Sequence, residues 1–151
     1  MPDIVVRCAT KEDVQTVLEL VRALAEYEKL EPPDQAAQAR FAADMVAERP
    51  RFEVYLAEYD GIVAGCAIVF ETYGSFQGKP KLYIEDLFIL DEYRRHGVGK
   101  VLFQSLIAEA HNRGYSTMEW TALDWNTSAH RFYHKMGGRR LETWQVFRLE
   151  L

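Results

Sequence analysis

Residues 93–103, YRRHGVGKVLF, place two arginines, a histidine and two glycines directly ahead of a helix-like apolar pattern. The first amides of a helix have no partner within the helix and lie at the positive end of its dipole, so they bind phosphate oxygens well. Gly97 and Gly99 would let a pyrophosphate approach the backbone without a Cβ clash. The stretch predicts an anion site, with a structural turn before a helix as the alternative. It is neither GxxxxGK[ST] nor GxGxxG with an acidic residue ~20 positions on.

Two neighbouring carboxylates, Glu85 and Asp86, lie in the strand-like stretch 81–90, KLYIEDLFIL. Successive residues of a strand point to opposite faces, so without a bulge only one of them lines a given cleft. The alternative for Asp86 is a bond to a neighbouring backbone group or arginine. Glu28, at the end of an amphipathic helix, would ordinarily be solvated.

The helical stretch 126–136 carries an aromatic residue and two histidines that could do chemistry. Tyr133 shares one face with Ala129 and Met136, and this spacing alone indicates a core aromatic. His130 and His134 are four residues apart, but no third ligand and no HExxH motif accompany them. We therefore predict no metal site.

Length and composition limit the class of protein. The chain has 151 residues, 48% of them hydrophobic and 27% charged, which fits one domain over residues 1–151. No cationic leader opens it and no stretch approaches the ~20 apolar residues of a membrane span, so we expect a soluble, cytoplasmic protein without membrane partners. Cys8 and Cys66 lie in apolar strand-like segments and are expected to be buried free thiols.

The net charge of −5 is unevenly distributed. Residues 1–92 hold 18 acidic against 9 basic side chains, net −9, and residues 93–151 hold 5 against 9, net +4. This asymmetry suggests a site that receives a cation from one side and a polyanion from the other, although solvated surface charge explains it equally well. The acidic balance argues against nucleic acid.

Periodicity, caps and turn residues predict the elements that must position these groups. They are a strand at 3–9, a capping box at 10–13, a helix from 14 to the break at 31–35, a helix at about 35–47, a hairpin at 51–71 turning at Asp60-Gly61, a strand at 81–90, a helix holding Val98 to Leu106, a strand at 116–125, a helix at 126–136 and a strand at 141–151. This order predicts a mixed sheet packed by helices on both faces.

The motif Arg94-x-x-Gly97-x-Gly99 follows the strand IEDLFIL and precedes ALDWNTSAHRFYHKMGG. The combination resembles the acetyl-coenzyme A-binding core of the GNAT superfamily of N-acetyltransferases over nearly the whole chain. The resemblance implies the GNAT fold, an α/β arrangement with a central, mostly antiparallel twisted sheet and helices on both faces. It also implies acetyl-coenzyme A as co-substrate, its pyrophosphate received by backbone amides of residues 95–100.

Together with LAEYEKLE at residues 24–31, these segments are similar to the diamine (spermidine/spermine) acetyltransferases and their thialysine-acetylating relatives. The similarity implies that Glu85 lies near the attacking amine and Tyr133 faces the sulfur. The implied substrate-binding residues are Tyr27, Glu28, Glu85, Asp86 and Glu142. The implied cofactor-binding residues are Leu87 and Ile89, whose backbone would bond the pantetheine arm, and Arg94, Arg95, His96, Gly97, Val98, Gly99, Lys100 and Asn126. For His96 taken by itself, the sequence favours a solvent-facing loop position over a cofactor contact.

This chain departs from the family pattern in two places. Arg95 stands where the family often has glycine. The segment between Gly138 and Trp144 is shorter than in the animal diamine enzymes, and this bears on the contact implied for Glu142.

Acetyl transfer to an amine poses two proton problems. An alkyl ammonium resembles lysine, with a pKa near ~10.4, and must lose a proton before it attacks a thioester. Glu85 would accept that proton, through water. The departing thiolate, with a pKa near ~8.5, takes a proton from an acid such as Tyr133.

The sequence predicts an acetyl-coenzyme A-dependent N-acetyltransferase that acts on a small cationic amine, a polyamine or diamine first, by direct attack in a ternary complex. An amino acid with an aminoalkyl side chain, such as thialysine or lysine, is the next alternative, and a protein amine the third. A module that binds acyl-coenzyme A without turnover would need the loop but neither Glu85 nor Tyr133. Related enzymes are usually dimeric, so we expect a homodimer.

Overall fold

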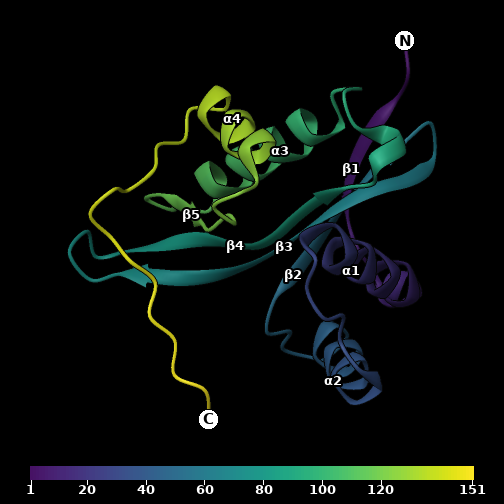
Figure 1. Ribbon diagram of the computed structural model, residues 1–151, viewed down its shortest axis with the longest axis horizontal. Coiled ribbons are helices and arrows are strands. Elements are labelled where there is room, and N and C mark those ends of the chain that lie inside the picture. Colours follow the sequence, from purple (N-terminus) through teal and green to yellow (C-terminus); the bar gives the residue numbers. More distant parts are fainter. The chain divides into compact units, whose positions relative to one another are not determined.

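The computed structural model describes residues 1–151, which form two compact units, residues 1–121 and residues 122–151. The first unit holds a five-stranded sheet in the order β1-β2-β3-β4-β5, in which β5 alone runs parallel to its neighbour (Figure 1). Its elements are β1 (Ile4–Cys8), α1 (Val14–Glu28), α2 (Gln35–Met45), β2 (Glu53–Tyr59), β3 (Ile62–Gly74), β4 (Lys79–Ile89), α3 (Val98–Asn112) and β5 (Met118–Trp120), with short 3₁₀ turns at Lys11–Asp13 and Asp91–Tyr93. The second unit holds α4 (Thr127–Lys135).

The predicted capping box at the start of α1 is present. Asp13 accepts a bond from the Thr10 amide at 2.7 Å, and its two oxygens accept from the Arg7 guanidinium at 2.8 and 3.0 Å. The hydrogen bond from Arg7 holds the pKa of the Asp13 carboxyl well below its usual range. The pair therefore fixes the helix start to β1.

The predicted hairpin turn at Asp60-Gly61 is confirmed. Both residues have positive φ, 50° and 82°, and Tyr59 pairs directly with Ile62. Two positive φ values in a two-residue loop match the twist of the flanking strands, which is why an Asp-Gly pair is favoured there. The turn sets the register of β2 and β3.

The sheet carries helices on both faces, as predicted (Figure 1). On one face, Val17 and Leu20 of α1 form a buried cluster with residues of β2 and β3, namely Val54, Leu56, Cys66 and Ile68. The alternate residues of the same strands, among them Ala57, Ala67 and Val69, are buried on the other face, where α3 contributes Leu102 and Leu106. The two buried layers pack the sheet between α1 and α3.

A β-bulge interrupts the pairing of β3 with β4. Ile68 pairs with Asp86 and Val69 with Ile84, so Glu85 is the extra residue on β4. Residues directly opposite each other share a face of the sheet. Asp86 therefore lies on the face of Ile68, which is the α1 face, whereas Ile84 lies with Val69 on the α3 face.

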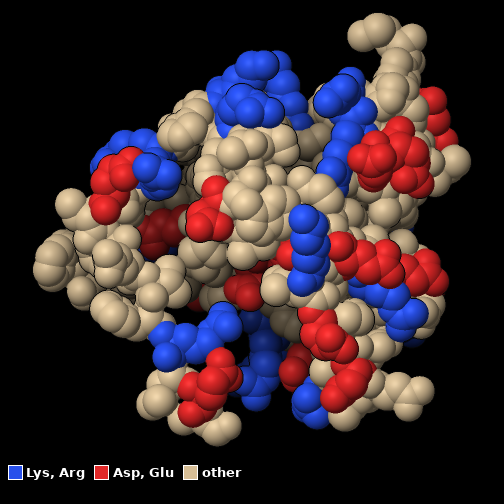
Figure 2. Space-filling view, in the orientation of Figure 1, with Lys and Arg blue, Asp and Glu red and all other residues tan.

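Acidic and basic side chains are mixed over the face drawn in Figure 2. Many of the chain's charges are paired, as Arg113 is with Glu53 and Glu109. No helix of the structure is both long and apolar enough to cross a membrane.

Three predictions about local structure are wrong. Residues 141–151 form no strand, because a strand needs a neighbour for its backbone groups and this segment pairs with none. The strand predicted at 116–125 is limited to Met118–Trp120, since the chain turns before α4 with a bond from the Asn126 amide to the Leu123 carbonyl. Cys8 is exposed, because it lies at the end of the edge strand β1, whereas Cys66 is buried as predicted.

Candidate active site

The turn ahead of α3 combines an open backbone with unpaired helix amides. Gly97 caps α3 with φ 84°, and a Cβ built on it meets nothing within 4 Å. The helical bonding begins with the Val101 amide, which donates to the Gly97 carbonyl at 3.1 Å. The amides of Val98, Gly99 and Lys100 consequently have no partner within the helix, and no side chain caps them. Such a turn can receive an anion.

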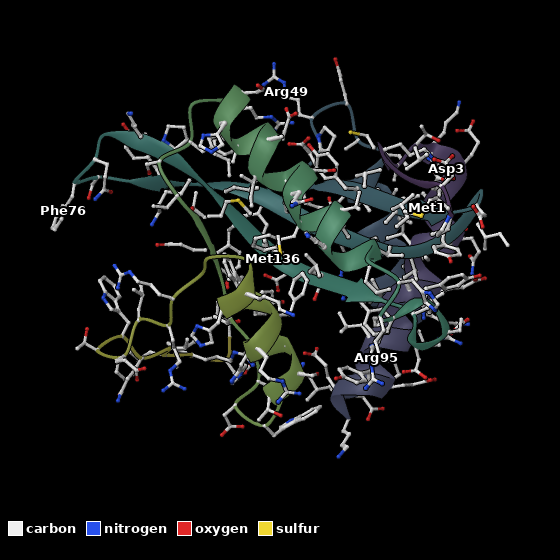
Figure 3. All side chains as sticks on the ribbon, turned by 90° about the horizontal axis from the view of Figure 1, so that it is seen from above. Met1, Asp3, Arg49, Phe76, Arg95 and Met136 are labelled. Atoms are coloured by element: carbon white, nitrogen blue, oxygen red, sulfur yellow. The ribbon has the colours of Figure 1, made fainter.

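Arg95 occupies a left-handed position on this turn. Its φ is 65°, and its exposed side chain is labelled in Figure 3. A residue with a Cβ loses roughly 1–2 kcal/mol in this conformation, and glycine does not. The backbone geometry therefore explains why the family pattern often has glycine at this position, and nothing in the structure explains the arginine.

Contacts on two sides hold the turn in place. Tyr59, at the end of β2, lies against Tyr93 and His96, with ring centroids 5.6 and 5.5 Å apart. On the other side, Arg94 Nε donates to the Ile89 carbonyl at 2.9 Å. These contacts attach the turn ahead of α3 to the ends of β2 and β4. No feature of the sequence marked Tyr59, because an aromatic residue in a strand indicates a core position.

The end of β4 leaves one side of its backbone open. β5 pairs only with Leu82, Tyr83 and Ile84, so no strand flanks residues 85–89 on the side away from β3. The Leu90 amide donates to Ala64 of β3 at 2.8 Å, and alternate residues of an antiparallel ladder bond to the same neighbour. Asp86 and Phe88 therefore bond toward β3, which leaves the N–H and C=O groups of two residues, Leu87 and Ile89, on the open side.

This open edge suits a ligand that carries amides. An extended chain with alternating donors and acceptors can add to a free sheet edge as a further strand does. The Ile89 carbonyl already accepts from Arg94, so the groups left for a ligand are both polar groups of Leu87 and the Ile89 amide. The edge leads directly into the turn ahead of α3.

Carboxylates gather where β4 faces the end of α1. Asp86 is half-buried on the α1 face, and burial, followed by the charges of Glu85 and Glu28, raises its pKa to about 6. Glu28, the last residue of α1, is also half-buried, and burial raises its pKa. In a regular β4, only one of Glu85 and Asp86 was expected to line a given cleft. The bulge at Glu85 breaks the alternation on which that expectation depended. Three acidic groups thus interact at one place.

Two further groups complete the surroundings of this acidic cluster. Tyr27, in the last turn of α1, lies 6.1 Å from the Phe88 ring and 4.2 Å below the Arg94 guanidinium. The Cys66 thiol is buried near Asp86, and burial raises its pKa to about 12. A thiol that holds its proton so firmly is no nucleophile.

The remaining candidate residues lie in the second unit. Asn126 caps α4, its Oδ1 accepting from the Ala129 amide at 3.4 Å. Tyr133 lies in the last turn of the helix, half-buried, with its ring 5.6 Å from that of Phe132. Glu142 is exposed and forms a local ion pair with Arg140 at 3.0 Å.

The two histidines of α4 differ in their surroundings. His130 Nε2 lies 2.9 Å from the Leu123 carbonyl, and His134 is exposed in the last turn. No group of three or more His, Cys, Asp or Glu side chains is arranged to hold a metal ion.

Comparison with known proteins agrees with this arrangement. Residues 14–138 match the model of the acetyltransferase (GNAT) family. The chain belongs to the GNAT family. This GNAT protein is 38% identical over 108 residues to L-ornithine N5-acetyltransferase NATA1 of Arabidopsis thaliana, a match that covers 70% of this chain and 47% of that protein.

Two full-length matches extend the likeness. Thialysine N-epsilon-acetyltransferase of Sus scrofa is 30% identical, with 99% of this chain and 94% of that protein covered. A possible acetyltransferase of Clostridium difficile 630 has the same fold, with a TM-score of 0.85 over 98% of this chain and 97% of that one, at 15% identity.

Family membership makes the protein an acetyl-coenzyme A-dependent N-acetyltransferase. The residues present fit that co-substrate. The turn with φ 84° at Gly97 leaves room for a pyrophosphate at the helix amides, and the open edge of β4 presents amide partners for the pantetheine arm.

Proposed function

We propose that this GNAT enzyme acetylates a primary amine of a small cationic substrate, a polyamine or diamine, by direct attack in a ternary complex. The observation that carries the proposal is the cluster of Glu28, Glu85 and Asp86 at the bulge of β4. A substrate with several positive charges offsets the mutual repulsion of these carboxylates, which a neutral amine does not.

The co-substrate is bound along β4 and the start of α3. Its pyrophosphate is received by the amides of residues 95–100, with Gly97 and Gly99 giving it access, and its amide arm by the open edge at Leu87 and Ile89. The remaining predicted members of this set are Arg94, Arg95, His96, Val98, Lys100 and Asn126. Bound there, the thioester supplies the electrophilic carbonyl that an amine attacks.

Two residues move the protons. Glu85, exposed at the bulge, takes the proton of the substrate ammonium through water, and Asp86 and Glu28 hold the cation beside it. Tyr133 donates a proton to the departing thiolate. Tyr27 and Glu142 complete the predicted substrate-binding set, of which Tyr27 belongs to the same helix end as Glu28.

An amino acid with an aminoalkyl side chain is the second candidate substrate. The relatives named for L-ornithine and thialysine favour it. Such a substrate also carries a carboxylate, which the acidic cluster repels, so it needs a cationic partner beyond the cluster. A protein amine is the third candidate.

A panel of amines decides between these substrates. Acetyl-coenzyme A is held saturating, and free thiol is measured with spermidine, a diamine, thialysine, ornithine, lysine and a lysine-containing peptide. We expect the highest kcat/KM for spermidine or the diamine. A higher kcat/KM for an amino acid would replace the polyamine proposal with the second candidate.

We further propose that the enzyme is a homodimer. Trp144 and Phe147 in the C-terminal segment are 77% and 92% exposed, and large exposed apolar side chains often belong to interfaces. Sedimentation at micromolar concentration should give twice the mass of the chain. A monomer under those conditions would remove this proposal.

A further inference from the structure

Arg94 lies against two aromatic rings that belong to different elements and that also contact each other, with ring centroids 6.1 Å apart. Its guanidinium carbon is 4.2 Å from the centre of the Tyr27 ring, in the last turn of α1. The same carbon is 5.3 Å from the centre of the Phe88 ring on β4. Both distances fall within the ~6 Å over which a cation is attracted to an aromatic face.

A directed hydrogen bond fixes the side chain beside the rings. Arg94 Nε donates to the Ile89 carbonyl at 2.9 Å, and the Arg94 amide donates to the Asp91 carbonyl at 3.1 Å. The only carboxylate partner, Asp91, is 3.9 Å away and 95% exposed, so it contributes little. The arginine side chain itself is only 29% exposed. Its position is therefore set by the rings and the carbonyl.

These contacts join three segments that are separate in the sequence. Tyr27 precedes Glu28, the last residue of α1, and the C-cap Lys29, with a left-handed φ of 60°, turns the chain away. Phe88 lies two residues after Asp86 and therefore on the same face of β4, which is the α1 face. Arg94 itself begins the turn that leads to α3. One side chain thus contacts the end of α1 beside the acidic cluster and the open edge of β4, and it belongs to the turn ahead of α3, residues 94–97, here called the anion turn.

We propose that Arg94 is a positioning residue that holds the last turn of α1, and with it Tyr27 and Glu28, against β4, so that the amine site keeps its shape. The inference rests on the proposed amine site at Glu28, Glu85 and Asp86. It assigns the guanidinium to the amine side of the reaction, in place of the cofactor contact that the family motif predicted for Arg94.

The chemistry of the contact favours arginine over lysine. A guanidinium is flat and delocalised, so it can contact aromatic faces while its Nε donates to a carbonyl. A lysine ammonium keeps the positive charge but cannot stack and donate in that way. Arg94→Lys therefore removes the guanidinium's contacts with the two rings and the Ile89 carbonyl but keeps the positive charge. The substitution thus separates positioning from electrostatic attraction of phosphate.

The test compares Arg94→Lys with Arg22→Lys, the same change at an exposed residue of α1. Spermidine kcat and KM are measured at saturating acetyl-coenzyme A, and the dissociation constant of acetyl-coenzyme A by calorimetry. Amide hydrogen exchange of a peptide covering residues 24–31 reports the last turn of α1, whose bonds include Leu30 N–H to the Ala25 carbonyl.

For Arg94→Lys we expect the spermidine KM to rise about tenfold, the scale of one desolvated cation–π contact, with the acetyl-coenzyme A dissociation constant within about threefold of wild type. Exchange in residues 24–31 should become faster, and Arg22→Lys should change none of these quantities. A double-mutant cycle with Phe88→Leu should be non-additive for KM, since both changes remove the same contact between the Arg94 guanidinium and the Phe88 ring.

Two results would overturn the inference. A rise of about tenfold in the acetyl-coenzyme A dissociation constant with an unchanged amine KM would make Arg94 a phosphate ligand. Unchanged exchange in residues 24–31 together with an unchanged KM would remove the positioning role. If wild-type enzyme does not acetylate spermidine, the polyamine proposal fails separately, and the KM of the amine that the panel identifies, read with the exchange data, decides the role of Arg94.

Discussion

Asp86→Asn should make the protein more stable at neutral pH while weakening its function. Asp86 is half-buried on the α1 face, close enough to Glu85 and Glu28 to feel both charges. Burial and these neighbours raise its pKa from an ordinary value of 3.8 to about 6. The folded protein therefore holds the Asp86 proton more tightly than the unfolded chain does.

The sign and size of the effect follow from that difference. Well below pH 3.8 the carboxyl is protonated in both states and costs nothing; the cost grows between about pH 4 and pH 6 and is complete above about pH 7. A difference of about 2 units, at 1.36 kcal/mol each, amounts to about 3 kcal/mol above pH 7. Asparagine has nearly the same shape and no charge, so Asp86→Asn should recover most of this free energy at pH 8 and almost none at pH 4.

Urea unfolding at pH 4, 6 and 8 measures the effect, with equal m-values as the check that both proteins unfold alike. Asp91→Asn, the same change at a carboxylate that is 95% exposed, is the control and should show no pH-dependent gain. The spermidine KM should rise in Asp86→Asn, because the variant lacks a charge that holds the cation. Equal stability of variant and wild type at pH 8, or an equal gain at pH 4 and pH 8, would refute the reasoning.

Three other substitutions test the remaining parts of the site. Gly97→Glu should weaken acetyl-coenzyme A binding at least about tenfold, since it adds a negative charge at the helix start. Asparagine tolerates the left-handed φ and carries no charge, so Gly97→Asn should bind acetyl-coenzyme A better than Gly97→Glu in calorimetry. Equal affinities of the two variants would place the phosphate elsewhere. Tyr133→Phe should lower kcat by roughly 10²–10⁴-fold when chemistry limits the rate, with the unfolding free energy changed by no more than about 1 kcal/mol; a kcat within about twofold of wild type would make the residue a packing tyrosine. Gly65→Ala should destabilise the protein by roughly 1–3 kcal/mol in urea unfolding, because its Cβ would collide with the Phe88 carbonyl and the Ile89 side chain, and unchanged stability would contradict that close approach.

Features set by neighbouring residues could be predicted from the sequence. The Asp60-Gly61 turn and the Thr10–Asp13 capping box depend on a few consecutive side chains and their φ preferences, and both are present. The turn ahead of α3 belongs to this class, because spacing alone places Gly97 at a helix start. The family resemblance was carried by other short motifs, among them Arg94-x-x-Gly97-x-Gly99.

Strand predictions were less secure because a strand is completed by a partner. The alternation in residues 141–151 has the apolar pattern of a strand, yet no neighbour pairs with it and its side chains are exposed. Cys8 has the apolar surroundings of a core residue in sequence, yet β1 is an edge strand. The local sequence indicates neither the lack of a partner strand for residues 141–151 nor the edge position of β1.

The arrangement of the acidic cluster was decided by tertiary structure alone. In sequence, Glu85 and Asp86 are adjacent and alternate, and Phe88 is one of several aromatic strand residues. The pairing of Ile68 with Asp86 and of Val69 with Ile84 makes Glu85 a bulge, which turns Asp86 and Phe88 toward α1 and allows Arg94 to contact the rings of both Phe88 and Tyr27. Register between two strands is a free-energy choice made over all their paired residues and both helical layers, so no single stretch of the chain contains it.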